Sequence, residues 1–189
     1  RLDQLRNGVF VSAVGANCIL HMTMLMAVFS TPFLIERGLG LSAAQTGTLL
    51  AVVQLSNTAM TLLSGWLHDR TRTPLLRPLA IGAVAAGLLT LGLTGAATSY
   101  PNFFAVSLLM GCGSGLFMTS NNTVIMSALP HSYTGFASGM LETTRQLGHT
   151  LGVVVATAGL SVIGTVPGEA QQAAFIAGFQ RACLLMGTI

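Results

Sequence analysis

The residues with the clearest chemical potential lie in an apolar segment in the last third of the chain. Glu142, Arg145 and His149 are separated by three and four residues, so they fall on one face of a helix. A carboxylate and a guanidinium can pair with each other or across helices, and an imidazole changes charge near neutral pH. Two roles are open for this face: a self-neutralising structural pair, or groups for proton coupling or substrate binding.

Polar side chains recur in three other apolar segments, on adjacent positions or at the spacing of a helical turn. Inside a membrane such groups either hydrogen-bond neighbouring helices or line a water-filled cavity. Both roles are open for each single amide, whereas the polar stripes taken together favour a cavity lined by four helices. With the three residues above, the candidates for cavity or proton-coupling groups are Asn17, His21, Gln54, Asn57, Asn121 and Asn122.

The composition indicates an integral membrane protein. Hydrophobic residues make up 52% of the chain and charged residues only 7%, whereas a soluble domain carries about 25% charged residues. The net charge of +3 comes from arginines near the predicted helix ends, which form no continuous basic face. Nucleic-acid binding is therefore not expected.

Neither an enzyme nor a metal site is expected. The cysteines Cys18, Cys112 and Cys183 lie in apolar segments and lack metal-binding spacing. The glycine-rich run from Gly111 to Gly115 lies inside an apolar segment without a lysine, so it predicts helix packing and not a phosphate loop. No nucleophile and base set is recognisable, and no cofactor is expected.

Six apolar segments are long enough for membrane-spanning helices, which need about 20 residues. Their short connections leave no room for a soluble domain. Because Arg181 lies close to the end of the last segment, we expect that helix to be truncated and the chain, which starts at Arg1, to be part of a longer membrane protein. The predicted helices cover about 9–31, 44–66, 78–98, 102–129, 135–164 and 173–189.

The arginines predict the orientation of the chain. Five of the eight precede the first helix or lie between the second and the third. Arginine is concentrated in cytoplasmic loops. The N-terminal end, the connection after the second helix and the connection near 130–133 are therefore expected on the cytoplasmic side of a cell (inner) membrane.

The stretch Gly65-Trp66-Leu67-His68-Asp69-Arg70 resembles the cytoplasmic loop motif of the major facilitator superfamily, G-x-L-x-D-R-x-G-R-[RK]. In that family the motif joins the second and third helices of a six-helix half, which is the matching place here. The resemblance implies gating roles for Gly65, Asp69 and Arg70. The pattern is lost after Arg70, and such erosion is typical of the motif's copy in the C-terminal half.

A second resemblance lies in the predicted helix 135–164. Gly135-Phe136-Ala137-Ser138-Gly139 and the later Arg145-Gln146-Leu147-Gly148 resemble the penultimate helix of the 14-helix drug:proton antiporters. The two resemblances together imply an all-α integral membrane fold, the C-terminal six-helix half of a transporter with a central cavity. Glu142 stands where an uncharged residue is more usual, so no family role is carried over to it.

The expected function is proton-coupled export of amphipathic drugs or related small molecules by alternating access. The expected partners are the lipid bilayer, a small-molecule substrate, protons and an N-terminal transmembrane half. The alternative is a non-transporting or degenerate membrane half that binds another subunit through its glycine faces. The two differ in whether the full-length protein moves a small molecule across the membrane.

Overall fold

The computed structural model describes residues 6–33, 35–36, 40–71, 75–93 and 99–163, together with 177, 178, 180, 181, 183 and 184. All regular structure in these residues is helical, which confirms the expected all-α class. The helices are α1 (Gly8–Phe33), α2 (Ala43–Thr71), α3 (Leu76–Gly92), α4 (Tyr100–Ser127), the short 3-10 turn η3 (His131–Tyr133) and α5 (Thr134–Ile163). Most of the predicted helix 173–189 lies outside the described residues.

Two helices begin at side chains that satisfy their first backbone amides. The Asn7 Oδ1 atom accepts hydrogen bonds from the amides of Val9 and Phe10, both at 3.1 Å, at the start of α1. At the start of α2, the Gln45 amide donates to Ser42 Oγ at 3.3 Å, and the Ser42 amide donates to Gln45 Oε1 at 3.0 Å. This reciprocal pair is a capping box, and it fixes where α2 leaves the preceding connection.

Two helix ends differ from the sequence-based bounds. The predicted second helix stops near 66, whereas α2 continues to Thr71. The Gly65 to Arg70 motif therefore occupies the last two turns of a helix rather than a loop. The predicted third helix reaches 98, whereas α3 ends at Gly92 and the residues from 94 to 98 lie outside the described part.

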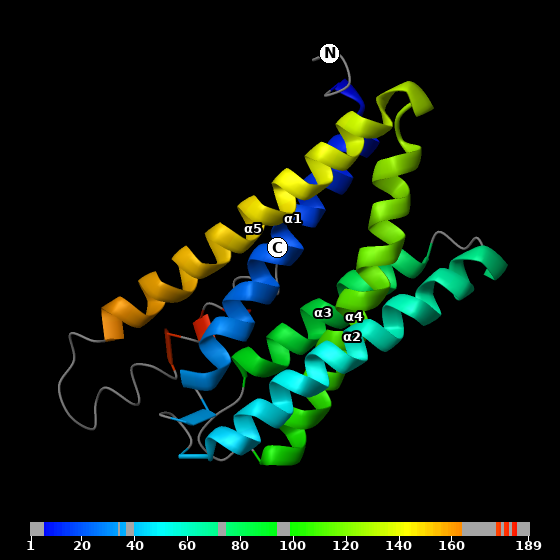
Figure 1. Ribbon diagram of the computed structural model, residues 1–189. Helices are drawn as coiled ribbons and strands as arrows, with labels where there is room; N and C mark the ends of the chain where they lie inside the picture. The colour runs from blue at the N-terminus through cyan, green and yellow to red at the C-terminus, as the bar shows by residue number, and fades with distance from the viewer. Residues whose placement is uncertain are drawn as a thin grey trace.

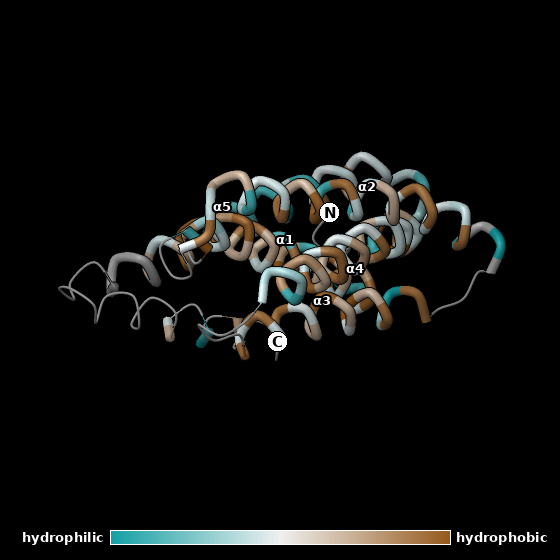
Figure 2. Tube along the Cα trace, turned by 90° about the horizontal axis from the view of Figure 1, so that it is seen from below, coloured by the Kyte–Doolittle hydropathy of each residue, from teal (hydrophilic) through white to brown (hydrophobic). Residues whose placement is uncertain are grey.

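The helices form two closely packed groups that α1 joins. Figure 1 shows α1 lying alongside α5, and α2 and α3 lying alongside α4, while α1 also contacts α4. Seen from below, α2 and α5 lie along one face and α3 lies along the opposite face (Figure 2). Of the two largest helix contacts, one joins α1 to α5 and the other joins α2 to α4.

Glycines set how closely these pairs approach. A Cβ atom at Gly115 would lie 2.3 Å from the Asn57 carbonyl oxygen of α2, and one at Gly113 would lie 3.0 Å from side-chain atoms of α3. The glycine-rich run of α4 is therefore a packing surface, as predicted, with α2 on one side and α3 on the other. Close approach of backbones through small residues is typical of membrane helices, which lack a hydrophobic force between them.

Three of the described helices are long and apolar enough to cross a membrane: Gly8–Phe33, Ala43–His68 and Tyr100–Ser127. α3 is apolar but shorter. α5 is 30 residues long, so its length suffices for a span. The apolar interior has its largest buried side chains on α1, α2, α3 and α4, among them Phe10, Met26, Leu49, Leu88 and Phe117.

Candidate functional site

Glu142 and Arg145 form an ion pair within α5. A guanidinium nitrogen of Arg145 contacts Glu142 Oε2, and Gln146 Nε2 donates to Glu142 Oε1 at 2.7 Å. The Arg145 side chain is 35% exposed and the Glu142 side chain 46% exposed. The sequence left open whether Glu142 and Arg145 pair with each other or with residues of other helices. In the structure they pair with each other. Gln146 was not among the candidates, although its position four residues after Glu142 is a usable signal.

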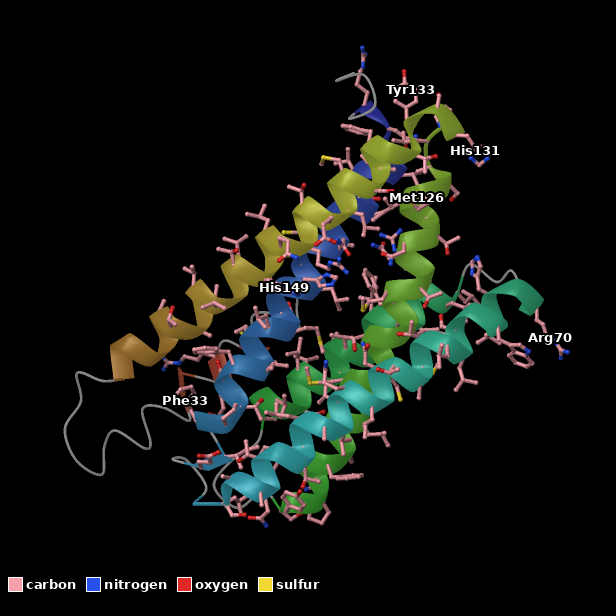
Figure 3. The ribbon with its side chains drawn as sticks, in the orientation of Figure 1. Phe33, Arg70, Met126, His131, Tyr133 and His149 are labelled. Carbon is pink, nitrogen blue, oxygen red and sulfur yellow. The ribbon has the colours of Figure 1, made fainter. Side chains whose placement is uncertain are left out.

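His149 faces His21 of α1, which brings together two candidates from separate helices. Their ring centroids are 5.1 Å apart and the ring planes cross at 62°, an edge-to-face arrangement. Figure 3 shows His149 about midway along α5, where that helix runs alongside α1. The His21 side chain is only 7% exposed. This contact could not be read from the spacing within either helix.

One ring nitrogen of His21 is already occupied. Its Nδ1 atom lies 2.8 Å from the Asn17 carbonyl oxygen, one turn earlier in α1. A carbonyl oxygen only accepts, so Nδ1 carries the hydrogen and donates it. In the neutral ring, Nε2 is then the atom with a free lone pair.

The Asn17 side chain joins α1 to α5. Its Nδ2 atom donates to the Leu141 carbonyl oxygen at 3.0 Å and to Thr144 Oγ1 at 3.1 Å, and the side chain is 2% exposed. Thr144 was not a candidate, although it lies between Glu142 and Arg145 in sequence. The amide therefore makes the helix-to-helix bonds that were one of its two expected roles.

The polar stripe of α2 divides between two environments. Asn57 Nδ2 donates to Ser114 Oγ of α4 at 2.7 Å, and Ser64 Oγ is fully buried 3.4 Å from the Leu116 carbonyl oxygen. Gln54 is exposed, as is Thr58 one turn later. Asn57 and Ser64 thus hold α2 on α4, whereas Gln54 and Thr58 are exposed.

Asn121 and Asn122 of α4 also differ. Asn121 is fully buried, and its Nδ2 atom donates to the Ala13 carbonyl oxygen of α1 at 3.0 Å. Its Oδ1 atom is buried and has no hydrogen-bond partner among the described residues. Asn122 is half-buried. Asn121 therefore lies in the α1–α4 contact and leaves one acceptor unsatisfied there.

The motif residues lie on the last two turns of α2. Gly65 is half-buried, and a Cβ atom there would meet nothing within 4 Å. The Arg70 guanidinium lies 4.7 Å from the centre of the Trp66 ring, a cation–π contact across one turn, and Figure 3 shows Arg70 at the end of the helix. The side chain of Asp69 lies outside the described part, so its gating role stays a prediction.

An apolar pocket lies between α1, α2, α3 and α4, toward the end of α1 that Figure 3 marks with Phe33. The pocket is lined mainly by aliphatic, aromatic and methionine side chains, with Thr31 and Ser107 as polar members. Methionine side chains adapt to apolar ligands of different shape. Within the described residues, no three His, Cys, Asp or Glu side chains come together as metal ligands.

Comparison with known sequences finds one matching family and several related proteins. Residues 2–153 match the Major Facilitator Superfamily. The chain is 34% identical over 163 residues to the uncharacterized transporter YebQ of Escherichia coli (strain K12), which covers 86% of this chain and 36% of that protein.

Two more distant relatives carry functional names. A tetracycline resistance determinant of Streptomyces rimosus is 25% identical, with 82% of this chain and 45% of that protein covered. The riboflavin transporter RibZ of Clostridioides difficile (strain 630) is 23% identical, with 78% and 32% covered. The chain thus spans between 32% and 45% of the length of these three curated relatives.

Proposed function

Because the chain belongs to the Major Facilitator Superfamily and is an integral membrane transporter sequence, we propose that it is the C-terminal half of a proton-coupled exporter of amphipathic small molecules. The other half would be an N-terminal six- or eight-helix segment. The proposed location is the cell (inner) membrane, and the proposed parent is a 14-helix drug:proton antiporter.

The observation that carries this proposal is the partly exposed ion pair on α5. Charged side chains facing lipid are costly, so they turn toward water or toward another part of the protein. Glu142 and Arg145 keep much of their surface exposed. On α2, which lies along the same face of the molecule in Figure 2, Gln54 and Thr58 are exposed as well. A polar face shared by two membrane helices supports a water-filled path.

The helices α1, α2 and α4 supply apolar surface. Met24 of α1, Leu49 of α2 and Phe103 of α4 line the pocket near the end of α1. Sites that bind small molecules combine apolar lining with a few placed polar groups. At about 30 Å³ this pocket is far smaller than such sites, so the proposal of an amphipathic substrate is supported by the names of two relatives, which refer to tetracycline and riboflavin.

The proposal is tested by efflux from cells that express the full-length protein. Cells are loaded with ethidium, a planar organic cation, and efflux is followed by fluorescence with and without a proton-gradient uncoupler. We expect the protein to speed efflux, and the uncoupler to abolish that gain because antiport draws on the proton gradient. Cells with the empty vector give the baseline.

Two results separate the parts of the proposal. Efflux that persists in uncoupled cells would contradict proton antiport while leaving transport intact. Efflux equal to the empty-vector baseline would favour the scaffold alternative over transport. Replacing Glu142 with Gln provides the site control, because it removes the charge that pairs with Arg145 and keeps the acceptor for Gln146.

A further inference from the structure

We propose that His21 of α1 and His149 of α5 form one proton-binding site that holds a single proton at a time. The inference rests on the proposed proton-coupled transport and names the groups that would carry the proton in this half. It starts from the contact between the two rings, whose centroids lie 5.1 Å apart across the α1–α5 interface. Each ring comes from a different helix, so the site exists only where the helices meet.

The first step is where the proton binds. The His21 Nδ1 atom donates to the Asn17 carbonyl oxygen at 2.8 Å, so His21 gains a proton only at Nε2. His21 is nearly buried and His149 is half-buried, which makes His149 the more accessible of the two rings. A proton entering the pair from water would therefore reach His149 before His21.

The second step is how many protons the pair holds. One imidazolium next to a neutral ring is favourable, because a cation is attracted to a neighbouring aromatic ring. Two imidazolium ions at this separation repel, and the repulsion is large where water is scarce. Interacting groups of this kind take up protons in separate steps that belong to the pair. The geometry thus gives a site that alternates between empty and singly protonated.

The other charged groups near His21 do not take part in this alternation. The other charged groups that act on His21 are Arg145 and Glu142 of α5, and these already neutralise each other. The helices α4 and α2 also contact α1. Their titratable side chains in the described part are Tyr100 and Cys112 on α4 and His68 and Arg70 in the last turns of α2.

The third step links the proton to helix movement. Gly148 precedes His149, and a Cβ atom there would lie 2.4 Å from the Cys18 carbonyl oxygen and 3.0 Å from the Cβ of His21. The two backbones therefore already touch beside the ring pair. The contact is tightly packed, so it cannot rearrange freely when one ring becomes charged. Protonation therefore changes how strongly α1 and α5 are held together.

The test uses the full-length protein in lipid vesicles with ethidium as probe. An imposed pH gradient drives accumulation of the probe, and a second assay without the gradient follows its passive equilibration through the protein. We expect His149→Gln and His21→Asn to lose the gradient-driven accumulation and to keep the equilibration. His131→Gln is the matched control, because His131 is exposed in the turn before α5.

The outcomes distinguish this inference from the proposed function. If the wild-type protein accumulates the probe with the gradient and His149→Gln does so equally, the histidine site is wrong and the proposed antiport stands. If the wild-type protein ignores the gradient, both are wrong. Should His21→Asn fail to reach the membrane, His149→Gln decides alone, because that ring is half-buried and its replacement remains polar.

Discussion

Asn17 and Asn121 each place an amide in one of the contacts that α1 makes, the first with α5 and the second with α4. Both side chains are almost completely buried, at 2% and 0% exposed. A buried amide that bonds a neighbouring backbone fixes the rotation of two helices about their axes, since the bond is lost if either helix turns. These residues therefore set which faces of α4 and α5 contact α1 and which do not.

At Asn17 we expect an alanine substitution to destabilise the protein. It removes the bonds to the Leu141 carbonyl oxygen and Thr144 Oγ1, and bonds between membrane helices contribute about 0.6 kcal/mol each on average. Thermal unfolding of the purified full-length protein should show a lower midpoint for Asn17→Ala than for wild type. Gln54→Ala is the control, because Gln54 is exposed on α2. An unchanged midpoint for Asn17→Ala would show that these bonds do not hold α1 on α5.

At the scale of elements, α5 has two pairs of glycines at the same spacing with different surroundings. The sequence predicts that both Gly135 with Gly139 and Gly148 with Gly152 allow close packing. In the structure, Cβ atoms at Gly148 and Gly152 would lie 2.4 Å from carbonyl oxygens of α1. Cβ atoms at Gly135 and Gly139 would meet nothing within 4 Å. Only the second pair is a packing surface within the described residues.

This difference gives a matched pair of substitutions on one helix. Gly148→Ala should separate α5 from α1 and cost about 1–3 kcal/mol, as other overpacked contacts do, because the nearest atom is a backbone oxygen that cannot move alone. Gly139→Ala should leave stability unchanged or slightly raised, since alanine favours a helix over glycine. Thermal unfolding compares the two, and equal effects of both substitutions would contradict the tight α1–α5 contact.

At the scale of the whole molecule, the helix directions fix which connections share a side. Figure 3 shows His131 and Tyr133 in the turn between α4 and α5, and Phe33 at the opposite end of the molecule. The N-terminal end of α1 lies near that turn, and the Asn7 side chain donates to the Ala128 carbonyl oxygen at 2.9 Å. The arginine distribution then predicts that this end faces the cytoplasm.

Accessibility to a membrane-impermeant thiol reagent tests that orientation. Single cysteines are introduced as Arg6→Cys, Ser132→Cys and Glu36→Cys after Cys18, Cys112 and Cys183 have been replaced by serine or alanine. We expect the first two to react in inside-out vesicles only, and Glu36→Cys to react in intact cells. Labelling of Ser132→Cys in intact cells would reverse the predicted orientation.

Several features of the protein could be predicted from the sequence alone. The three- and four-residue spacing of Glu142, Arg145 and His149 was sufficient to place them on one face, because a helix has a fixed number of residues per turn. Apolar length gave the helix bounds only approximately: the predicted fourth helix begins at about 102, whereas α4 begins at Tyr100 and includes Pro101 in its first turn. Composition alone indicated a membrane protein, since so few charges cannot cover a water-exposed surface.

Only the tertiary structure decided which partners these faces meet. No spacing relates His21 to His149, or Asn121 to Ala13, because those contacts join positions more than a hundred residues apart. The glycine pairs of α5 look alike in sequence, and only the position of α1 distinguishes them. Periodicity is a property of one helix and can be read along the chain, whereas the rotation and neighbours of that helix come from packing between helices. For that reason the sequence determined the polar faces and the family resemblance, and the structure decided that the rings of His21 and His149 contact each other.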